Sequence, residues 1–268
     1  MFALLAFYAF AIGAIVGSFL NVVIYRYPLE QSIVFPRSHC PRCQALIRWY
    51  DNVPVLSYLI LLGRCRRCRG SISPRYPLIE LANALFYLAI FLRTGPTFTF
   101  LLVAAVVSMT IVLIFIDCEI QILPDVIDLP GVAIGLLIGG LHLGAGDHGL
   151  LLTSTLMESF IGAALGGGIL LAVALTYKLV RGIDGMGLGD VKMMAMIGAI
   201  SGWRAVLPVI LIAAVSGAIT GLGILAMLRR SDLKFALPFG VFLGLGFLAV
   251  LFFGTDQLTW LSTLAPTD

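Results

Sequence analysis

Four of the five cysteines lie in two Cys-x-x-Cys pairs, and these residues are the best spaced to hold a metal ion. Cys40 and Cys43 form the first pair, and Cys65 and Cys68 form the second. Two such pairs offer four thiolates to one ion, a ligand set that builds a closed tetrahedral site. Because a closed site leaves no position for a substrate, the spacing predicts a structural ion, with Zn2+ favoured over iron. Two disulfide bonds are the alternative.

The location of these cysteines favours the metal site over the disulfides. They lie in the polar stretch 26–76, which holds nine arginines and is predicted to face the cytoplasm, where thiols stay reduced. A small loop with few apolar residues also needs a bound ion to fold. We interpret His39 as a neighbouring loop histidine, although it could replace a cysteine as a ligand. Cys118 is interpreted as an ordinary small apolar residue.

Asp117 and Asp190 are the second set of residues whose types and places suit chemistry. Asp117 lies where an expected helix meets the cytoplasm, and Asp190 ends the glycine-rich stretch 185–190 on the same side. Two carboxylates in contact cannot both ionise easily, so one keeps a proton, and such a pair can activate water and protonate a leaving amide nitrogen. Taken singly, each acid has a structural explanation. Asp117 could mark a helix end, and Asp125 and Asp190 could cap the helices that follow.

The composition indicates that these residues belong to a membrane protein. Hydrophobic residues make up 60% of the 268 residues and charged residues 12%, whereas a soluble domain has about 45–50% and about 25%. The apolar residues form blocks close to the ~20 residues that cross a bilayer, which predicts an all-α integral membrane fold with about eight transmembrane helices. Six blocks are clear, at 2–25, 94–116, 129–146, 159–177, 205–228 and 235–255. Two are weaker, at 77–92, which Glu80 interrupts, and at 193–203, which is short.

Glycines four residues apart recur in these blocks. One group of three is Gly131, Gly135 and Gly139. Three pairs are Gly162 with Gly166, Gly217 with Gly221, and Gly240 with Gly244. This spacing lets helices approach one another closely, and packing is the whole role that we expect for these glycines.

The positions of lysine and arginine predict the orientation of the chain. With eight crossings, 15 of the 17 basic residues fall in loops on one side, and the positive-inside rule places that side in the cytoplasm. These loops are 26–76, 117–128, 178–192 and 229–234, and the turn 144–149 is expected outside. Basic residues next to a lipid bilayer favour contact with anionic lipid over binding of nucleic acid.

The chain resembles the type 4 prepilin leader peptidases, GxGD-type membrane aspartyl proteases that also N-methylate their product. The segments that carry the resemblance lie at 17–28, at the two cysteine pairs, and at 52–59, 75–81, 116–125, 185–192 and 237–240. A GxGD tetrapeptide is a weak indication by itself, but all these segments in one order are highly specific. The resemblance implies that Asp117 and Asp190 are the catalytic aspartates. Family members often have a second aspartate two residues after the first, where this chain has Glu119.

The resemblance also implies a substrate, a second cofactor and a location. Such an enzyme cleaves the basic leader of prepilin or pseudopilin precursors, which serve type IV pili or type II secretion, at the cytoplasmic face of the bacterial inner membrane. It then methylates the new amino terminus with S-adenosylmethionine, for which the sequence shows no binding residues. Glu80 could contact that amino terminus, but a capping or packing role is favoured. The chain is then expected to have three parts. They are a first transmembrane helix (1–25), a cytoplasmic tetra-cysteine domain (26–76) and a transmembrane aspartyl peptidase domain (77–268).

Two other functional classes stay open on the sequence. A transporter would hold its ionisable groups near the bilayer midplane on broken helices, whereas the acids here cluster at helix ends. A non-catalytic assembly scaffold could use the metal-bound loop as a docking surface. Such a scaffold would not need two acids at one depth in the membrane.

Overall fold

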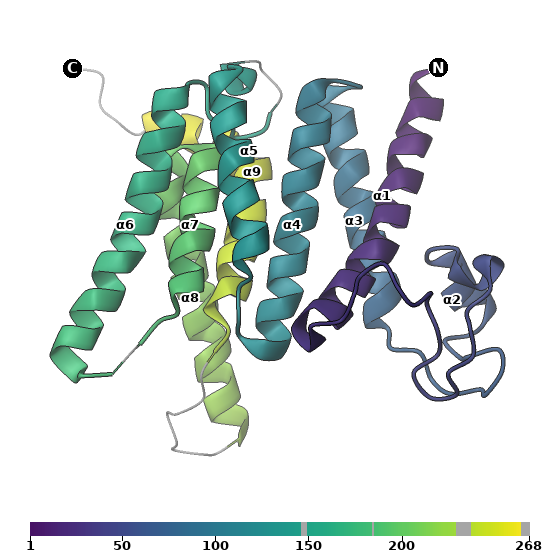
Figure 1. The fold of residues 1–268 in the computed structure, drawn as a ribbon. Coiled ribbons are helices and arrows are strands. Elements are labelled where there is room, and N and C mark those ends of the chain that lie inside the picture. The colour runs from purple at the N-terminus through teal and green to yellow at the C-terminus, as the bar shows by residue number, and fades with distance from the viewer. Residues whose placement is uncertain (146–148, 184, 229–236, 264–268) are drawn as a thin grey trace, which may run out of the picture. The chain divides into compact units, whose positions relative to one another are not determined.

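The computed structural model describes residues 1–145, 149–183, 185–228 and 237–263. Within these ranges the regular structure is helical, and extended residues pair only at two isolated bridges. The chain divides into two compact units, Met1–Val112 and Leu113–Asp268, with the boundary inside helix α4 (Figure 1). The predicted turn 144–149 lies partly outside the described residues, and the predicted loop 229–234 lies wholly outside them.

The first unit is built on the packing of α1 against α3. Its helices are α1 (Phe2–Arg26), α2 (Leu56–Ile60), α3 (Arg75–Thr94) and the first part of α4 (Phe98–Ile120), with short 3-10 helices at Tyr27–Leu29 and Trp49–Asn52. A Cβ atom on Gly17 would lie 2.8 Å from the Cα atom of Glu80, so α1 needs a glycine where it crosses α3. The buried amide of Asn83 fastens the two helices, because its Nδ2 donates a hydrogen bond to the carbonyl oxygen of Gly13 at 2.7 Å.

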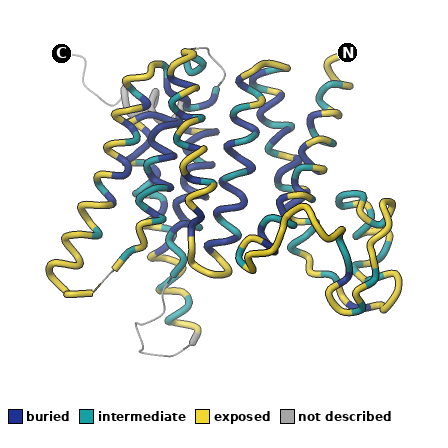
Figure 2. Tube along the Cα trace, viewed as in Figure 1, coloured by how far each residue is buried: buried dark blue, intermediate teal, exposed yellow. Residues whose placement is uncertain are grey.

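The second unit is arranged around α7. Its helices are the end of α4, α5 (Asp125–Gly140), α6 (Leu156–Arg181), α7 (Leu188–Ser201), α8 (Trp203–Leu228) and α9 (Phe239–Thr263), with a 3-10 helix at Leu143–Ala145. α7 packs against α5, α6, α8 and α9, and most of it is buried from Asp190 onward (Figure 2). A Cβ atom on Gly135 would lie 2.6 Å from the backbone carbon of Ala199, and one on Gly166 would lie 2.5 Å from the carbonyl oxygen of Met194. The packing role predicted for these two glycines is confirmed.

The ends of α6 show how local sequence sets a helix boundary. The hydroxyl of Thr155 accepts a hydrogen bond from the backbone amide of Glu158 at 3.2 Å, and the carboxylate of Glu158 accepts one from the amide of Ser154 at 2.9 Å. Both bonds satisfy amides that have no partner inside the helix. At the other end Gly182 has a φ angle of 69°, the left-handed conformation that ends a helix.

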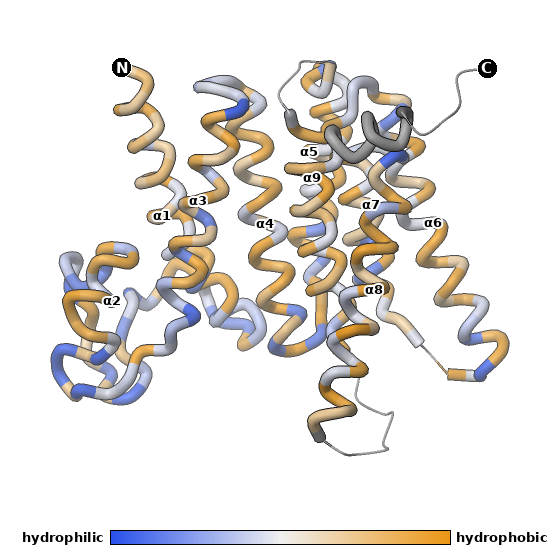
Figure 3. The backbone as a smooth tube through the Cα atoms, turned by 180° about the vertical axis from the view of Figure 1, so that it is seen from behind, coloured by the Kyte–Doolittle hydropathy of each residue, from blue (hydrophilic) through white to orange (hydrophobic). Residues whose placement is uncertain are grey.

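Five helices of the described residues are long and apolar enough to cross a membrane, namely α1, α3, α4, α6 and α8. The apolar part of α9, Phe239–Gly254, is shorter, and α5 and α7 have 16 and 14 residues, fewer than the ~20 that span the hydrocarbon core. Hydrophobic residues dominate the long helices, whereas hydrophilic residues gather in the loop between α1 and α3 (Figure 3). The chain is therefore a helical, multi-pass membrane protein.

Each predicted block corresponds to a helix, but the helix ends differ near the acids. α4 continues to Ile120, so Asp117 lies in its last turn, and α5 begins at Asp125 rather than at residue 129. The predicted loop 117–128 is therefore helical at both of its ends. The physical reason is that a count of apolar residues stops at the first charge, whereas a helix continues wherever the fold can accommodate that charged side chain.

Candidate active site and metal centre

Asp117 reaches from the last turn of α4 to the first turn of α9. It is 4% exposed, and its Oδ2 atom accepts a hydrogen bond from the backbone amide of Val241 at 3.0 Å. The amide of Gly240 donates to the same carboxylate. Amides in a first helical turn have no partner within the helix, so they suit a carboxylate. A Cβ atom on Gly240 would lie 2.9 Å from Oδ2 of Asp117, so this glycine makes room for the acid and its role exceeds the packing that we predicted.

Asp190 is the third residue of α7 and is 9% exposed. Its carboxylate accepts a hydrogen bond from the backbone amide of Gly187, the residue that precedes the helix. An acid at this position that reaches back to the capping residue is one half of a capping box. A capping contact, the alternative explanation that the sequence left open for Asp190, is thus present. This hydrogen bond uses only part of the carboxylate, since its two oxygen atoms offer about four acceptor sites.

Both acids belong to the second unit, and the structure brings them near one another. Asp190 lies within electrostatic range of Asp117. The side chain of Leu123, which is 8% exposed, packs against Gly189, the neighbour of Asp190, and against Gly240, which adjoins Asp117. A Cβ atom on Gly189 would lie 2.8 Å from Cβ of Leu123, and one on Gly240 would lie 3.0 Å from its Cδ1 atom. An apolar side chain at this place lowers the local polarity, which strengthens the interaction between the two carboxylates.

The other acids near this site differ in exposure. Glu119, two residues after Asp117, is exposed. Asp125 does not cap α5, because Pro124 precedes the helix, and both of its carboxylate oxygens instead accept hydrogen bonds from Nζ of Lys192 at 2.7 Å. This ion pair is exposed on both sides, so it contributes little to stability.

Asp128 is a buried acid that the sequence analysis missed, because it was counted as part of a loop. It is 0% exposed and lies in the first turn of α5. An indication was present in the sequence. Asp128 precedes Gly131 by three residues and Gly135 by seven, so a helix that begins before it places all three on one face.

The four cysteines of the two pairs form one cluster in the first unit. Their Sγ atoms all lie within 4.8 Å of one another, and all four cysteines are free thiols. The Sγ atoms of Cys40 and Cys68 are 3.9 Å apart, and a tetrahedral ion with bonds of about 2.3 Å holds its sulfur ligands about 3.8 Å apart. The residues therefore fit a Zn2+ ion. His39 is not in the cluster, since its Nδ1 atom hydrogen-bonds to the carbonyl oxygen of Arg37 at 3.1 Å.

The two cysteine pairs are built in the same way. The amide of Cys40 donates to the carbonyl oxygen of Ala45 at 2.9 Å, and the amide of Cys65 donates to that of Gly70 at 2.8 Å. Hydrogen bonds from the backbone of Cys68 and Arg67 lower the pKa of the Cys65 thiol to about 7, because amide donors stabilise the thiolate. Metal ions bind the thiolate, so this turn prepares Cys65 for a cation.

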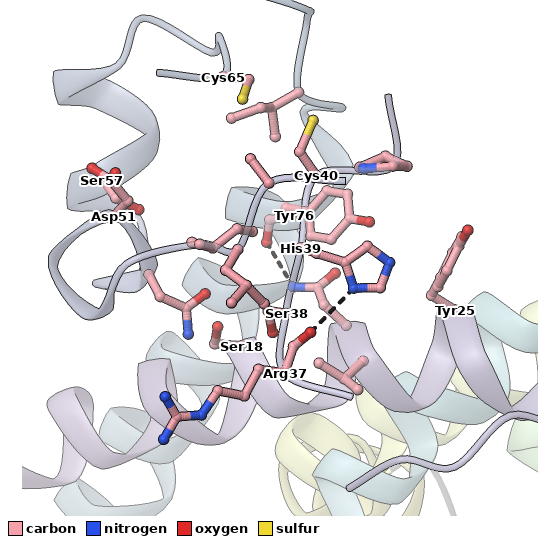
Figure 4. A pocket seen from close by; sticks show the side chains of 18 of the residues that line it. Ser18, Tyr25, Arg37, Ser38, His39, Cys40, Asp51, Ser57, Cys65 and Tyr76 are labelled. Atoms are coloured by element: carbon pink, nitrogen blue, oxygen red, sulfur yellow. Dashed lines mark hydrogen bonds between the residues drawn. The ribbon is translucent and has the colours of Figure 1, made fainter. Parts of the chain in front are cut away.

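A cavity of about 2000 Å³ opens in the first unit beside the cysteine cluster. Ser18 and Tyr25 come from α1, Tyr76 comes from α3, and residues 37–40 form another part of the wall (Figure 4). Oδ1 of Asn21, which also lines the cavity, is buried and has no hydrogen-bond partner among the described residues. Seven arginines line the cavity, namely Arg26, Arg37, Arg42, Arg48, Arg66, Arg67 and Arg75.

Glu80 forms part of the same wall. It is 8% exposed, and its Oε2 atom accepts a hydrogen bond from the backbone amide of Val55 at 2.7 Å. This bond ties the residue before α2 to the first half of α3. The contact supports the structural role that the sequence favoured for Glu80.

Similarity to known proteins covers both units. The Bacterial Peptidase A24 N-terminal domain matches residues 11–94, and the Type IV leader peptidase family matches residues 104–222. The chain is 37% identical to the prepilin leader peptidase/N-methyltransferase of Burkholderia pseudomallei (strain 1026b), over 92% of this chain and 85% of that protein. It is 36% identical to the protein of that name from Pseudomonas putida, over 91% of this chain and 89% of that protein. It is also 36% identical to the one from Pseudomonas aeruginosa, over 92% of this chain and 90% of that protein. No solved structure gives a significant match.

These identities extend over most of the chain and over most of each relative. The two family matches include the four clustered cysteines, Asp117 and Asp190. With these similarities added to a paired-acid site in a helical membrane unit, the chain belongs to the type IV leader peptidase family.

Proposed function

We propose that the chain cleaves the basic leader of type 4 prepilin or pseudopilin precursors, with Asp117 and Asp190 as its catalytic residues. The observation that carries this proposal is the pair of buried carboxylates at the starts of α9 and α7. The names of the relatives, prepilin leader peptidase/N-methyltransferase, suggest the substrate and a second activity. A transporter or a scaffold does not need two acids that lie within electrostatic range of each other, each bound by backbone amides at the start of a helix.

In the proposed reaction one aspartate is ionised and takes a proton from a water molecule, while its protonated partner polarises the scissile carbonyl. The water oxygen bonds to the carbonyl carbon, a proton passes to the amide nitrogen, and the carbon–nitrogen bond breaks. The products are the free leader and a shortened pilin with a new amino terminus. The amides of Val241 and Gly187 hold the two carboxylates in place before the substrate arrives, which limits reorganisation during the reaction.

Cleavage of a model precursor by the purified full chain in detergent tests this proposal. The precursor carries a basic leader followed by an apolar helix, and mass spectrometry locates the cut. One shortened product with a single new amino terminus is expected. A folded preparation that leaves the precursor intact would contradict the proposed peptidase.

We propose that the active site faces the cytoplasm of a bacterial inner membrane, because the basic residues of the chain gather on the corresponding side. On this basis residues 26–76 form a cytoplasmic tetra-cysteine domain, between a first helix, 1–25, and a transmembrane peptidase domain, 77–268. The precursor's own apolar helix would then lie in the bilayer beside the enzyme.

Reporter fusions are expected to place the loop 26–76 in the cytoplasm and the turn 144–149 outside. The physical reason is the excess of lysine and arginine on one side, which resists translocation. A reporter fused after residue 32, after residue 147, or to a chain truncated after residue 228 measures on which side of the membrane each position lies. Residues 147 and 229–234 lie outside the described residues, so the measurement adds to the structure. Both loops on one side would contradict the eight-crossing topology.

We propose that the two implied cofactors bind in the first unit. The four clustered cysteines would hold Zn2+, which stabilises the loop and takes no part in the cleavage. The cavity beside them would hold S-adenosylmethionine. Arginine pairs well with a carboxylate, a buried amide oxygen such as that of Asn21 accepts a hydrogen bond from an ammonium or amino group, and tyrosine rings attract a cation. Pockets for one small molecule measure roughly 300–1,000 Å³, so this cavity also has room for a peptide amino terminus.

Loss of one cavity arginine is expected to weaken S-adenosylmethionine binding, while loss of a catalytic aspartate is not. Arg37→Gln removes a charged donor from the wall, and a charge-assisted hydrogen bond is worth roughly 1.5–3 kcal/mol, so the Kd should rise about tenfold or more. Arg69→Gln is the matched control, because Arg69 lies in the same loop but outside the lining. Equilibrium binding of labelled S-adenosylmethionine measures the effect.

Methylation of a pre-cleaved peptide gives the second readout. Asp190→Asn should retain this activity, since transfer of a methyl group to an amine does not need the carboxylate pair. An unchanged Kd in Arg37→Gln would argue against the cavity as the cofactor site. Loss of methylation in a folded Asp190→Asn variant would show that the two sites are not separate.

A further inference from the structure

Asp128 is a buried acid for which the proposed reaction has no role. It is 0% exposed, and neither of its carboxylate oxygens has a hydrogen-bond partner in the part of the chain that the structure describes. An ionised carboxylate buried without partners is very unfavourable, so we expect a neutral acid here. An apolar residue would fill the same space without this cost. The presence of an acid therefore needs an explanation.

Asp128 lies on the face of α5 that packs against α7, the helix whose first turn contains Asp190. Gly135, two turns further along the same face, contacts Ala199 of α7 so closely that a Cβ atom would lie 2.6 Å from its backbone carbon. Asp190 lies within electrostatic range of Asp128 as well as of Asp117. Two further acids, one from α4 and one from α5, therefore act on Asp190.

The charged groups that face Asp128 come from α5 and α7. They are Asp125 on its own helix, and Lys192 and Asp190 on α7. Lys192 is bound to Asp125 at 2.7 Å, so these two groups largely cancel each other. Asp190 is the remaining charged group that acts on Asp128.

α6 also packs against α5, but it brings no ionisable side chain to the level of Asp128. The hydroxyl of Ser159 donates to the carbonyl oxygen of Gly135 at 2.8 Å, which sets the register of the two helices. Asp128 lies about 10 Å along α5 from that point, whereas the ionisable residues of α6 in the same direction begin at Tyr177, about 27 Å along the helix.

We propose that Asp128 is a positioning residue of the peptidase centre, a carboxyl beside Asp190 that extends the alkaline range in which Asp117 and Asp190 keep one shared proton. The inference rests on the proposed peptidase function. As long as Asp128 is neutral it adds no charge to the site, and the single negative charge of the working catalytic pair has no third charge beside it. Once Asp128 ionises, its charge opposes the loss of the last proton from the pair, because like charges at short range in a protein interior repel each other.

The pH–rate profile of precursor cleavage tests this role with Asp128→Asn, which keeps the shape of the side chain but cannot ionise. The alkaline limb is expected to move to lower pH by about one unit, the effect of one charge at about 10 Å in a protein interior. The rate at the optimum should stay within about threefold of wild type, since the reacting groups are unchanged. Glu119→Gln is the control, and it should leave the limb in place because Glu119 is exposed and screened by solvent and salt.

Thermal unfolding of the full chain in detergent separates this role from a structural one. Asp128→Leu replaces an unpartnered acid by an apolar residue of similar size, so the Tm should rise by about 2–4 °C. A lower Tm in both Asp128→Leu and Asp128→Asn would show that the acid stabilises the fold, and would overturn the proposal.

The outcomes also separate this inference from the proposed function. Asp117→Asn and Asp190→Asn are measured in the same assay. If either cleaves at the wild-type rate, the peptidase proposal fails and this inference fails with it. If both are inactive and the alkaline limb of Asp128→Asn coincides with that of wild type, only the role of Asp128 is rejected.

Discussion

Asp117→Asn and Asp190→Asn are each expected to slow precursor cleavage by about 10²–10⁴-fold, because a positioned acid or base contributes a factor of this size. An asparagine keeps the hydrogen-bonding shape of the side chain, so the fold should survive. It cannot take or give the proton, however. The double variant should be no slower than either single variant, since the two carboxylates act as one unit. The pair should likewise titrate as a unit with two apparent pKa values, which the pH–rate profile of wild type measures.

The controls for this experiment are acids of the same region that the structure places differently. Glu119→Gln and Asp125→Asn should keep most of the activity, because both residues are exposed and Asp125 is engaged with Lys192. Asp184→Asn should behave in the same way, although Asp184 lies outside the described residues. Full activity in either Asp117→Asn or Asp190→Asn would reject the aspartyl mechanism. An inactive Asp125→Asn beside an active Asp117→Asn would show that the first acid is misassigned.

Cys40→Ser is expected to cost the protein its metal ion and the order of residues 26–76. Structural zinc contributes on the order of 10 kcal/mol to the folding of small metal-bound peptides, and three thiolates with one hydroxyl hold it much less tightly. Elemental analysis of purified protein measures the ion, with one per chain expected in wild type. Limited proteolysis of the loop measures its order.

Cys118→Ser is the matched control, because Cys118 is exposed and lies outside the cluster. It should keep both the ion and the protease resistance of the loop. Peptidase activity should fall less in Cys40→Ser than in the aspartate variants, since the acids belong to the other compact unit. Freshly purified wild-type protein without metal, or a Cys40–Cys43 disulfide in cells, would contradict the metal site.

The fold class and the gathering of the four cysteines could be predicted from the sequence because they depend on composition and short spacings. Long apolar blocks have few ways to satisfy their backbone in lipid other than as helices, so the membrane helices follow from composition. The spacing within each cysteine pair is that of a metal-binding turn, and the structure indeed gathers Cys40, Cys43, Cys65 and Cys68. The catalytic role of Asp117 and Asp190 came from the family resemblance and stays a prediction.

Contacts between residues far apart in the chain could not be predicted in the same way. The amide of Val241 binds Asp117 across 124 positions, and a glycine at 240 is needed because the carboxylate occupies the place of a side chain. Nothing in the local sequence of either residue indicates this pairing. Leu123 likewise packs against both Gly189 and Gly240 only because the starts of α7 and α9 lie next to the turn between α4 and α5.

Asp128 shows where the division lies. The sequence by itself determined that an acid precedes a glycine-lined helix face, and helical periodicity was enough to place it on that face once the start of α5 was known. Only the tertiary structure decided that α5 begins at Asp125, that α7 covers this face, and that neither carboxylate oxygen of Asp128 finds a partner among the described residues. Helix boundaries and burial depend on which surfaces meet, and that is a property of the packed chain rather than of any segment of it.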